Sequence, residues 1–327
     1  MIRRRPRESP LIPYEMFDAD RTRQEADIAR KLERVYHKGQ DKVWDGKQVL
    51  AELIEKHGGI QASPETLAPL SHLFAVILWG ELAAWKVAAS LSLELDPLEV
   101  KMATTAQAHD EARHFYVMHD YLDLIGYVPE RLPATAARVL EEVVGASSMA
   151  KKILGMHLMI EPIALTLFQV VREQRFEPVL CDLLKLYERD EARHVALGVH
   201  YLPTLMKGMR RRELLDLWSW QLKMFMLQLD GLADMESDFR ALGLHPREVL
   251  RLGQAKQLQA SEIMLEELGM KSLAREVFVR VIEARLEWQF PQDDAPTDLS
   301  SRMQRVLRAA VYGPGEMPDG GLAGVSA

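Results

Sequence analysis

The pentapeptide Asp-Glu-Ala-Arg-His occurs twice in this chain, first within Gln107-Ala108-His109-Asp110-Glu111-Ala112-Arg113-His114 and again, unchanged, at residues 190–194. Each copy places a histidine three positions after a glutamate. Residues i and i+3 lie on one face of an α-helix, so each copy offers one carboxylate and one imidazole to a common point. The two pairs are Glu111 with His114 and Glu191 with His194.

A single glutamate precedes each copy at a matched distance. Glu81 stands 30 positions before Glu111, and Glu161 stands 30 positions before Glu191. Both lie in otherwise apolar segments, where a buried ionised carboxylate costs several kcal/mol unless a cation or strong donors compensate it. Two such glutamates in phase with two Glu-x-x-His motifs indicate one shared compensating charge.

Together these residues make a set of four carboxylates and two imidazoles on four helices. This is the ligand pattern of di-iron and di-manganese carboxylate bundles, in which each half supplies a terminal glutamate, a bridging glutamate and a histidine. Oxygen-rich ligation suits iron or manganese, whereas structural zinc sites rely on thiolates that a single cysteine cannot supply. We therefore predict a site for two iron ions, or one manganese and one iron, with the ligands Glu81, Glu111, His114, Glu161, Glu191 and His194.

The repeat also has a plainer explanation. Arg113 and Arg193 could form ion pairs with neighbouring carboxylates, as in many helical repeats. That explanation does not account for the lone glutamates at matched distance, so we favour the metal site.

Further residues are expected to support the ligands. Metal-bound histidine usually donates its second ring N–H to a carboxylate or a carbonyl. We predict that Asp190 orients His114 and that Asp110 orients His194, across a pseudo-twofold axis. His157, four positions before Glu161, is interpreted as a hydrogen-bonded core histidine, with a seventh ligand or a proton relay as the alternatives.

Helix start and stop signals cover most of the chain, and no run of alternating polar and apolar residues suggests a strand. We predict an all-α fold: a four-helix bundle with additional N- and C-terminal helices. The expected helices cover about residues 18–37, 42–57, 64–95, 97–126, 134–144, 148–176, 178–203, 211–242, 246–268 and 272–289.

The predicted organisation has four parts. Residues 1–63 form an N-terminal arm with accessory helices, and residues 64–205 form the bundle. Residues 206–311 supply helices packed on the bundle, and the Gly- and Pro-rich residues 312–327 form a disordered tail.

Composition narrows the class of protein. A net charge of -7 argues against general nucleic-acid binding. The most apolar windows, residues 73–95 and 153–171, are interrupted by carboxylates, so we expect buried helices and no membrane association. No apolar segment follows the N-terminal arginines, and Cys181 is the single cysteine. Both features favour a cytoplasmic protein.

The six-residue pattern resembles the ferritin-like di-metal carboxylate superfamily over about residues 64–205. The segment Asp-Glu-Ala-Arg-His-Val-Ala-Leu-Gly is most similar to two branches: the ligand-binding oxidases related to the ribonucleotide reductase small subunit, and the aryl-amine N-oxygenases. The resemblance implies an O2-using enzyme and a homodimer.

The chain departs from these relatives at several positions. Met118 stands where reductase small subunits carry a radical tyrosine, so a reductase subunit is not expected. Tyr187 replaces the extra histidine of the N-oxygenases. Met156 and Ala84 stand where the oxidases form a tyrosine–valine crosslink, which therefore cannot form here.

An apolar cavity is expected beside the metals. Pro162 cannot donate to the carbonyl of Leu158, so the helix should open locally at this turn. The residues expected to line the cavity are Ala84, Ala88, Met118, Met156, Leu158, Leu165, Phe168, Met224 and Met226.

The function expected from all of this is an O2-activating di-metal oxidase or oxygenase, such as a monooxygenase. It would act on a small apolar or aromatic substrate, with O2 as co-substrate and an electron donor that the sequence does not identify. The alternative is a ferroxidase or iron-handling protein without an organic substrate.

Overall fold

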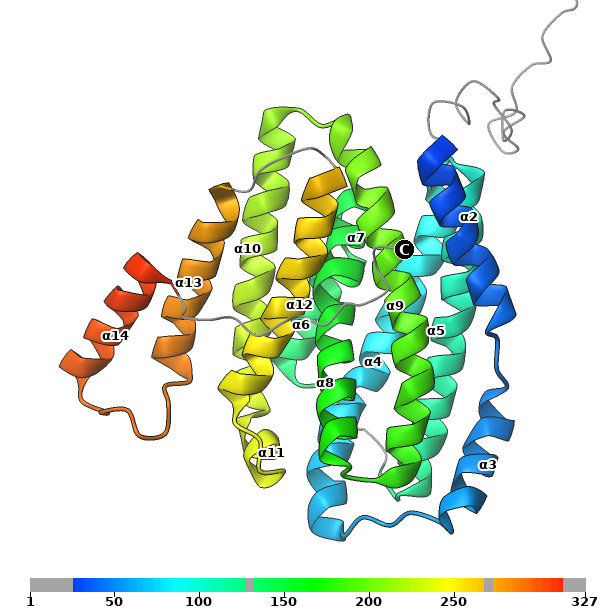
Figure 1. Cartoon of the computed structure of the whole chain (residues 1–327), viewed down its shortest axis with the longest axis horizontal. Helices are drawn as coiled ribbons and strands as arrows, with labels where there is room; N and C mark the ends of the chain where they lie inside the picture. Colours follow the sequence, from blue (N-terminus) through cyan, green and yellow to red (C-terminus); the bar gives the residue numbers. More distant parts are fainter. Residues whose placement is uncertain (1–25, 128–131, 268–272, 314–327) are drawn as a thin grey trace, which may run out of the picture.

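The computed structural model describes residues 26–127, 132–267 and 273–313, and the regular structure in these ranges is helical throughout (Figure 1), which confirms the all-α prediction. The helices are α2 (Ala26–Asp41), α3 (Gly46–His57), α4 (Pro64–Glu94), α5 (Leu98–Leu124), α6 (Ala134–Val144), α7 (Met149–Gly155), the π-helix η1 (Met156–Ile160), α8 (Glu161–Gln174), α9 (Pro178–Lys207), α10 (Arg211–Asp234), α11 (Glu236–Ala241), α12 (Pro246–Glu267), α13 (Leu273–Gln289) and α14 (Leu299–Tyr312).

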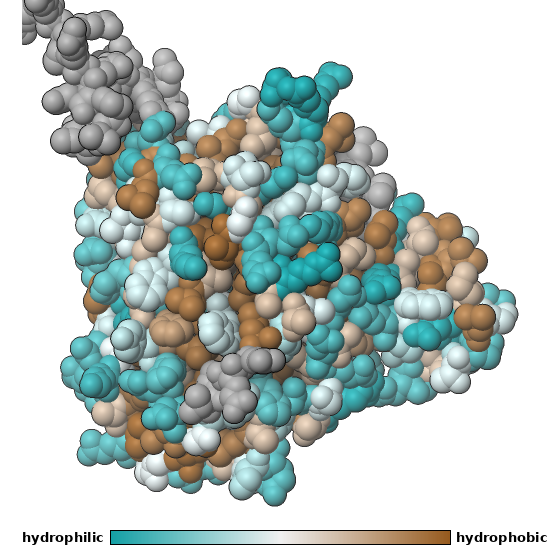
Figure 2. All heavy atoms as spheres, turned by 180° about the vertical axis from the view of Figure 1, so that it is seen from behind, coloured by the Kyte–Doolittle hydropathy of each residue, from teal (hydrophilic) through white to brown (hydrophobic). Residues whose placement is uncertain are grey.

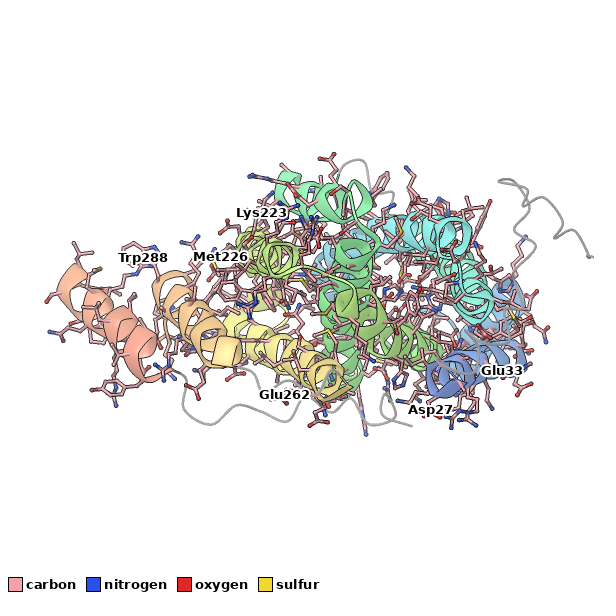
Figure 3. All side chains as sticks on the ribbon, turned by 90° about the horizontal axis from the view of Figure 1, so that it is seen from above. Asp27, Glu33, Lys223, Met226, Glu262 and Trp288 are labelled. Carbon is pink, nitrogen blue, oxygen red and sulfur yellow. The ribbon has the colours of Figure 1, made fainter. Side chains whose placement is uncertain are left out.

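Four long segments form the expected bundle. Helix α4 packs along α5, and α8 packs along α9, which also contacts η1 and α5. Helices α2 and α3 cover α5 and α9 on one side, as Figure 1 shows. Seen from above in Figure 3, α10 and α12, which carry Met226 and Glu262, lie between the bundle and the α13 helix that carries Trp288.

Side-chain caps define the starts of α3 and α9. Asp45 caps α3 by accepting from the Gln48 amide at 2.7 Å, and Gly58 ends the helix with a φ of 69°. Glu177 caps α9 by accepting from the Leu180 amide at 2.7 Å. A side-chain oxygen at the N-cap satisfies one of the free amides of the first helical turn. Helix α9 begins at Pro178, as expected, whereas α3 begins at Gly46, four residues after the expected start at residue 42.

The helix expected over residues 148–176 is interrupted. It consists of α7, the five-residue π-helix η1 and α8, with the Glu161 amide bonded to the carbonyl of Met156. This widened turn lies directly before Pro162, which agrees with the opening predicted from the missing proline N–H. Helix α9 approaches η1 closely at Gly198, so that a Cβ placed on this glycine would lie only 2.4 Å from the Cβ of His157.

Other helix predictions were wrong. Helix α2 ends at Asp41 and not near residue 37. The helix expected over 211–242 is divided into α10 and α11 at Met235. Helix α9 continues through Pro203 to Lys207. Helix α14 was not predicted, and most of its apolar residues stay exposed, including Leu299, Leu307 and Val311. From behind, Figure 2 shows hydrophobic residues on the projecting end that α13 and α14 form.

Two helical segments, Pro64–Glu94 and Met149–Gln174, are long and apolar enough to cross a membrane by length and composition. Most of each apolar window is buried inside the protein, as expected for core helices of a bundle. The start of the helix expected from residue 18 and the residues before it lie outside the described residues. Of the tail expected over residues 312–327, Tyr312 ends α14 and residues 314–327 lie outside the described residues.

Candidate metal centre

The six predicted ligands meet in the interior of the bundle. Each of the six is at least 96% buried. They form two overlapping groups, and within each group the candidate ligand atoms lie within 4.8 Å of one another. One group is Glu81, Glu111, His114 and Glu191, and the other is Glu111, Glu161, Glu191 and His194.

Glu111 and Glu191 belong to both groups, and their oxygens are divided between the two histidines. Glu111 places Oε1 at 3.1 Å from Nδ1 of His194 and Oε2 at 3.7 Å from Nδ1 of His114. Glu191 places Oε1 at 3.2 Å from Nδ1 of His114 and Oε2 at 3.3 Å from Nδ1 of His194. This is the arrangement that two bridging carboxylates need.

Glu81 and Glu161, the lone glutamates, each belong to one of the two ligand groups only. Oε2 of Glu81 lies 3.4 Å from Nδ1 of His114, whereas Glu161 belongs only to the group of His194. The two halves therefore have the same composition: one terminal carboxylate, one imidazole and a share of both bridging carboxylates.

The donor set fits two divalent cations. Oε2 of Glu111, Oε2 of Glu161 and Nδ1 of His114 are buried without a hydrogen-bond partner among the described residues. Buried polar atoms are rarely left unpaired, because each one loses its hydration without compensation. Two divalent ions would neutralise four carboxylates and occupy these free lone pairs, which neighbouring protein groups do not.

The directions of the pKa shifts reflect the same excess of buried carboxylates. Burial raises the pKa of Glu81 and Glu161 well above the ordinary value, and the charge of Glu191 adds to the effect. Burial disfavours the imidazolium form, yet hydrogen bonds and charges from nearby carboxylates raise the pKa of His114 and His194 well above the ordinary value. The metal-free centre therefore holds protons, which metal binding would release.

The two aspartates face the histidines crosswise. Nε2 of His114 lies 3.3 Å from Oδ2 of Asp190, and Nε2 of His194 lies 3.4 Å from Oδ2 of Asp110. A carboxylate at Nε2 favours the tautomer with the proton on that atom, which leaves Nδ1 as the lone-pair donor facing the carboxylate cluster. The structure thus has the geometry that the predicted orienting role requires.

The ion pairs of Arg113 and Arg193, which the alternative explanation of the repeat predicts, are also present. Arg113 contacts Asp110 at 2.5 Å and Asp190 at 2.9 Å, and Arg193 contacts Asp190 at 2.8 Å and Asp110 at 2.9 Å. Burial opposes ionisation of Asp110, but His194 and Arg193 outweigh it and lower its pKa to about 2. Arg113, Arg193, Asp110 and Asp190 form an Arg–Asp box, in which the arginines keep both aspartates ionised next to the histidines.

The two halves differ on their outer side. Nε1 of Trp44 donates to Oδ2 of Asp190 at 2.8 Å, and the guanidinium carbon of Arg113 lies 4.8 Å from the Trp44 ring centroid. Tyr187 stacks on the ring of His114 at 4.2 Å between centroids and donates to the His114 carbonyl at 2.5 Å. Tyr187, at the position of the N-oxygenases' extra histidine, therefore packs on a predicted ligand and supplies no ring nitrogen.

One residue of the centre was missed by sequence reasoning. Nε2 of Gln107 donates to Oε1 of Glu161 at 2.9 Å and to Oε1 of Glu111 at 3.0 Å. Oε1 of Gln107 lies 2.8 Å from Nε2 of His157, whose Nδ1 faces the Ile153 carbonyl at 3.2 Å. His157 thus reaches the centre through Gln107, and neither candidate group includes it. A polar residue one turn before Glu111 was the available signal.

An apolar cavity adjoins the cluster, with Glu81, Glu111 and Glu191 in its wall and a volume of about 160 Å³. Of the expected lining residues, Ala84 and Met156 face it. The expectation was wrong for Ala88, Met118, Leu158, Leu165, Phe168, Met224 and Met226.

On η1 and α8 the cavity is lined by a different helix face from the expected one. The face that lines the cavity is Ile160, Ile163, Ala164 and Leu167, which has the i, i+3, i+4, i+7 spacing of one helix face.

The chain is similar to known proteins. A solved variant of an R2-like ligand-binding oxidase with an aerobically reconstituted Mn/Fe cofactor resembles the chain with a TM-score of 0.44 at 14% sequence identity, over 86% of this chain and 93% of that chain. No curated protein matches the sequence. The model of the family described as p-aminobenzoate N-oxygenase AurF matches residues 88–277, more than half of the chain. The chain therefore belongs to the p-aminobenzoate N-oxygenase AurF family.

Proposed function

We propose that the protein is an O2-activating di-metal oxidase or oxygenase that acts on a small apolar or aromatic substrate. The observation that carries this proposal is the shared wall between the cavity and the predicted ligands Glu81, Glu111 and Glu191. Membership of a family named for an N-oxygenase supports an oxidoreductase. Oxidation of an aromatic amine nitrogen is the reaction that we propose on this basis.

In this proposal Glu81, Glu111, His114, Glu161, Glu191 and His194 hold two iron ions, or one manganese and one iron, since the same ligands suit both metals. Bound there in reduced form, the two metals would supply electrons to O2 and make it reactive toward the substrate.

The residues of the chain perform the remaining tasks. Glu111 and Glu191 keep the two halves together, and the Arg–Asp box fixes the tilt of both imidazoles. Gln107 donates a hydrogen bond to Glu161, and its amide oxygen contacts the ring of His157. The aliphatic cavity face excludes water and places a substrate ring against the ligand cluster.

The apolar cavity favours this function over ferroxidase or iron-storage chemistry, which needs no organic substrate site. An electron donor, a homodimer, a cytoplasmic location and the division at residues 64 and 206 remain our predictions.

Oxygen consumption tests the proposal. Metal-loaded, chemically reduced protein should consume O2 with p-toluidine as a single-ring amine and yield an N-oxygenated product. A Glu111→Ala, Glu191→Ala double variant serves as the control and should do neither. Metal-loaded protein that consumes no O2 would refute the enzymatic proposal, whereas iron mineralisation by a 24-subunit assembly would establish the iron-handling alternative.

A further inference from the structure

Three glutamines lie in the wall of the apolar cavity. They are Gln228 on α10 and Gln254 and Gln257 on α12, and each is at least 93% buried. Glutamine is mostly an exposed residue, and its amide loses hydration when buried unless it finds both a donor and an acceptor. Three together in one cavity therefore need an explanation.

Only part of their hydrogen-bonding capacity is used. Nε2 of Gln257 donates to the Met159 carbonyl at 2.6 Å and lies 3.2 Å from Oε1 of Gln228, so these two amides hold each other in place. Nε2 of Gln228 and both Oε1 and Nε2 of Gln254 have no partner among the described residues. The side chains that line the cavity thus hold two unpaired donor nitrogens and one unpaired acceptor oxygen, all three of them buried.

The same wall offers no positive charge. Among the described residues that line the cavity, the charged ones are Glu81, Glu111 and Glu191, and none is lysine, arginine or histidine. A carboxylate at the end of the substrate opposite the predicted metals would lose its hydration with no lysine, arginine or histidine side chain in the described wall to compensate it. An uncharged polar group would meet the free amide groups of the glutamines without this penalty.

We propose that Gln254, together with Gln228 in the same cavity wall, binds the uncharged head group of a single-ring substrate, and that this group both donates and accepts hydrogen bonds, as a primary carboxamide does. The inference rests on the proposed function for the reacting end of the substrate, which meets Glu81, Glu111 and Glu191. The cavity volume of about 160 Å³ suits one ring, since an engineered apolar cavity of about 150 Å³ binds benzene. By this reasoning the protein discriminates against p-aminobenzoate itself.

Three ring amines that differ only in the opposite substituent test this selectivity: 4-aminobenzamide, 4-aminobenzoate and p-toluidine. Binding to the metal-loaded protein is measured by calorimetry without O2, so that no turnover occurs. We expect 4-aminobenzamide to bind about tenfold more tightly than either of the others, because only it pairs with the free amide of Gln254.

A Gln254→Met variant keeps the side-chain length and removes both polar atoms. It should bind 4-aminobenzamide no more tightly than p-toluidine, with p-toluidine itself changed by about twofold or less. Gln169→Met is the matched control, because Gln169 is paired with Glu173 and does not line the cavity. If Gln254→Met does not fold, a crystal structure of the parent protein with 4-aminobenzamide decides the question by the position of the amide.

The proposal is overturned if 4-aminobenzoate binds as tightly as the amide, if Gln254→Met keeps the amide preference, if the bound amide lies away from Gln254, or if none of the three compounds binds. These outcomes are separable from failure of the proposed function. A protein that prefers the amide but consumes no O2 refutes the enzyme alone, and one that oxidises p-toluidine without an amide preference refutes the glutamine site alone.

Discussion

Gln107 on α5 donates to Glu161 on α8, with 2.9 Å between Nε2 and Oε1, and so joins two helices of the bundle directly at the predicted metal centre. The same amide nitrogen reaches Glu111, which faces both histidines. A neutral amide thereby positions a terminal carboxylate without adding charge, a role usually expected of groups that surround metal ligands.

Removing this amide should weaken one half of the centre. In Gln107→Leu we expect metal affinity on the Glu161–His194 side to fall by about tenfold or more, since positioning partners typically contribute 10- to 100-fold. Titration against a competing chelator measures both sites. The control is Thr105→Ala, an exposed position on the same helix. Unchanged affinity at both sites would contradict the role.

Loss of both bridging carboxylates should empty the centre. A Glu111→Ala, Glu191→Ala double variant is expected to hold no metal where the parent holds two ions per chain, because each ion loses two of its ligands. Elemental analysis of purified protein checks this. Asp123→Ala, an exposed change on α5, should keep both ions. Two equivalents in the double variant would refute the ligand assignment.

The two aspartates should differ in importance. Asp190 accepts hydrogen bonds from Trp44, Arg113 and Arg193 and also faces His114. Asp190→Asn therefore removes the negative charge that compensates these buried donors. We expect about 3–5 kcal/mol lower stability and weaker metal binding.

Asp110→Asn should cost less stability, since no tryptophan donor to Asp110 is observed among the described residues. Chemical denaturation with metal analysis compares the two variants, and Asp120→Asn on the exposed side of α5 is the control. Full metal occupancy and activity in both variants would show that neither aspartate orients its histidine.

Ala84 provides a steric test of the cavity. It is 4% exposed and lines the cavity beside Glu81, so Ala84→Phe should fill the substrate space and abolish p-toluidine binding. Metal content should stay at the parental level, and the stability change should be below about 1 kcal/mol because the ring enters existing space. Calorimetry and elemental analysis check both. Lower metal content with a large loss of stability would identify Ala84 as ordinary core.

Metal removal should reverse the pH dependence of stability. In the metal-free protein the pKa values of Glu81, Glu161, His114 and His194 are raised, so the folded state binds more protons than the unfolded state. Its stability should therefore fall as pH rises above the ordinary glutamate value of 4.5, and further above the ordinary histidine value of 6.5.

Denaturation at about pH 6 and about pH 8 measures the effect. The chelated protein should be less stable at the higher pH, whereas the metal-loaded protein should be more stable there, because fewer protons compete with the metals. The same slope in both forms would mean that these four groups do not share their site with metal ions.

The sequence carried more information about the centre than about its surroundings. Local helix geometry alone places the glutamate and the histidine of Glu-x-x-His on one face. The two lone glutamates at matched distances complete the set, so six candidate ligands could be named from the sequence. The cross-pairing of Asp190 with His114 followed from the pseudo-twofold repeat. Proline and glycine signals located most helix boundaries for the same reason: they depend on neighbouring residues alone.

Tertiary structure decided what depends on contacts between distant segments. The cavity lies against Ile160, Ile163, Ala164 and Leu167, a helix face that local spacing alone does not single out as the one facing the metals. The contact of Gln107 with Glu161 joins residues 54 positions apart, and the glutamines of α10 and α12 reach the cavity only because those helices pack on the bundle. Local periodicity specifies which face a residue occupies, but long-range packing determines what that face meets.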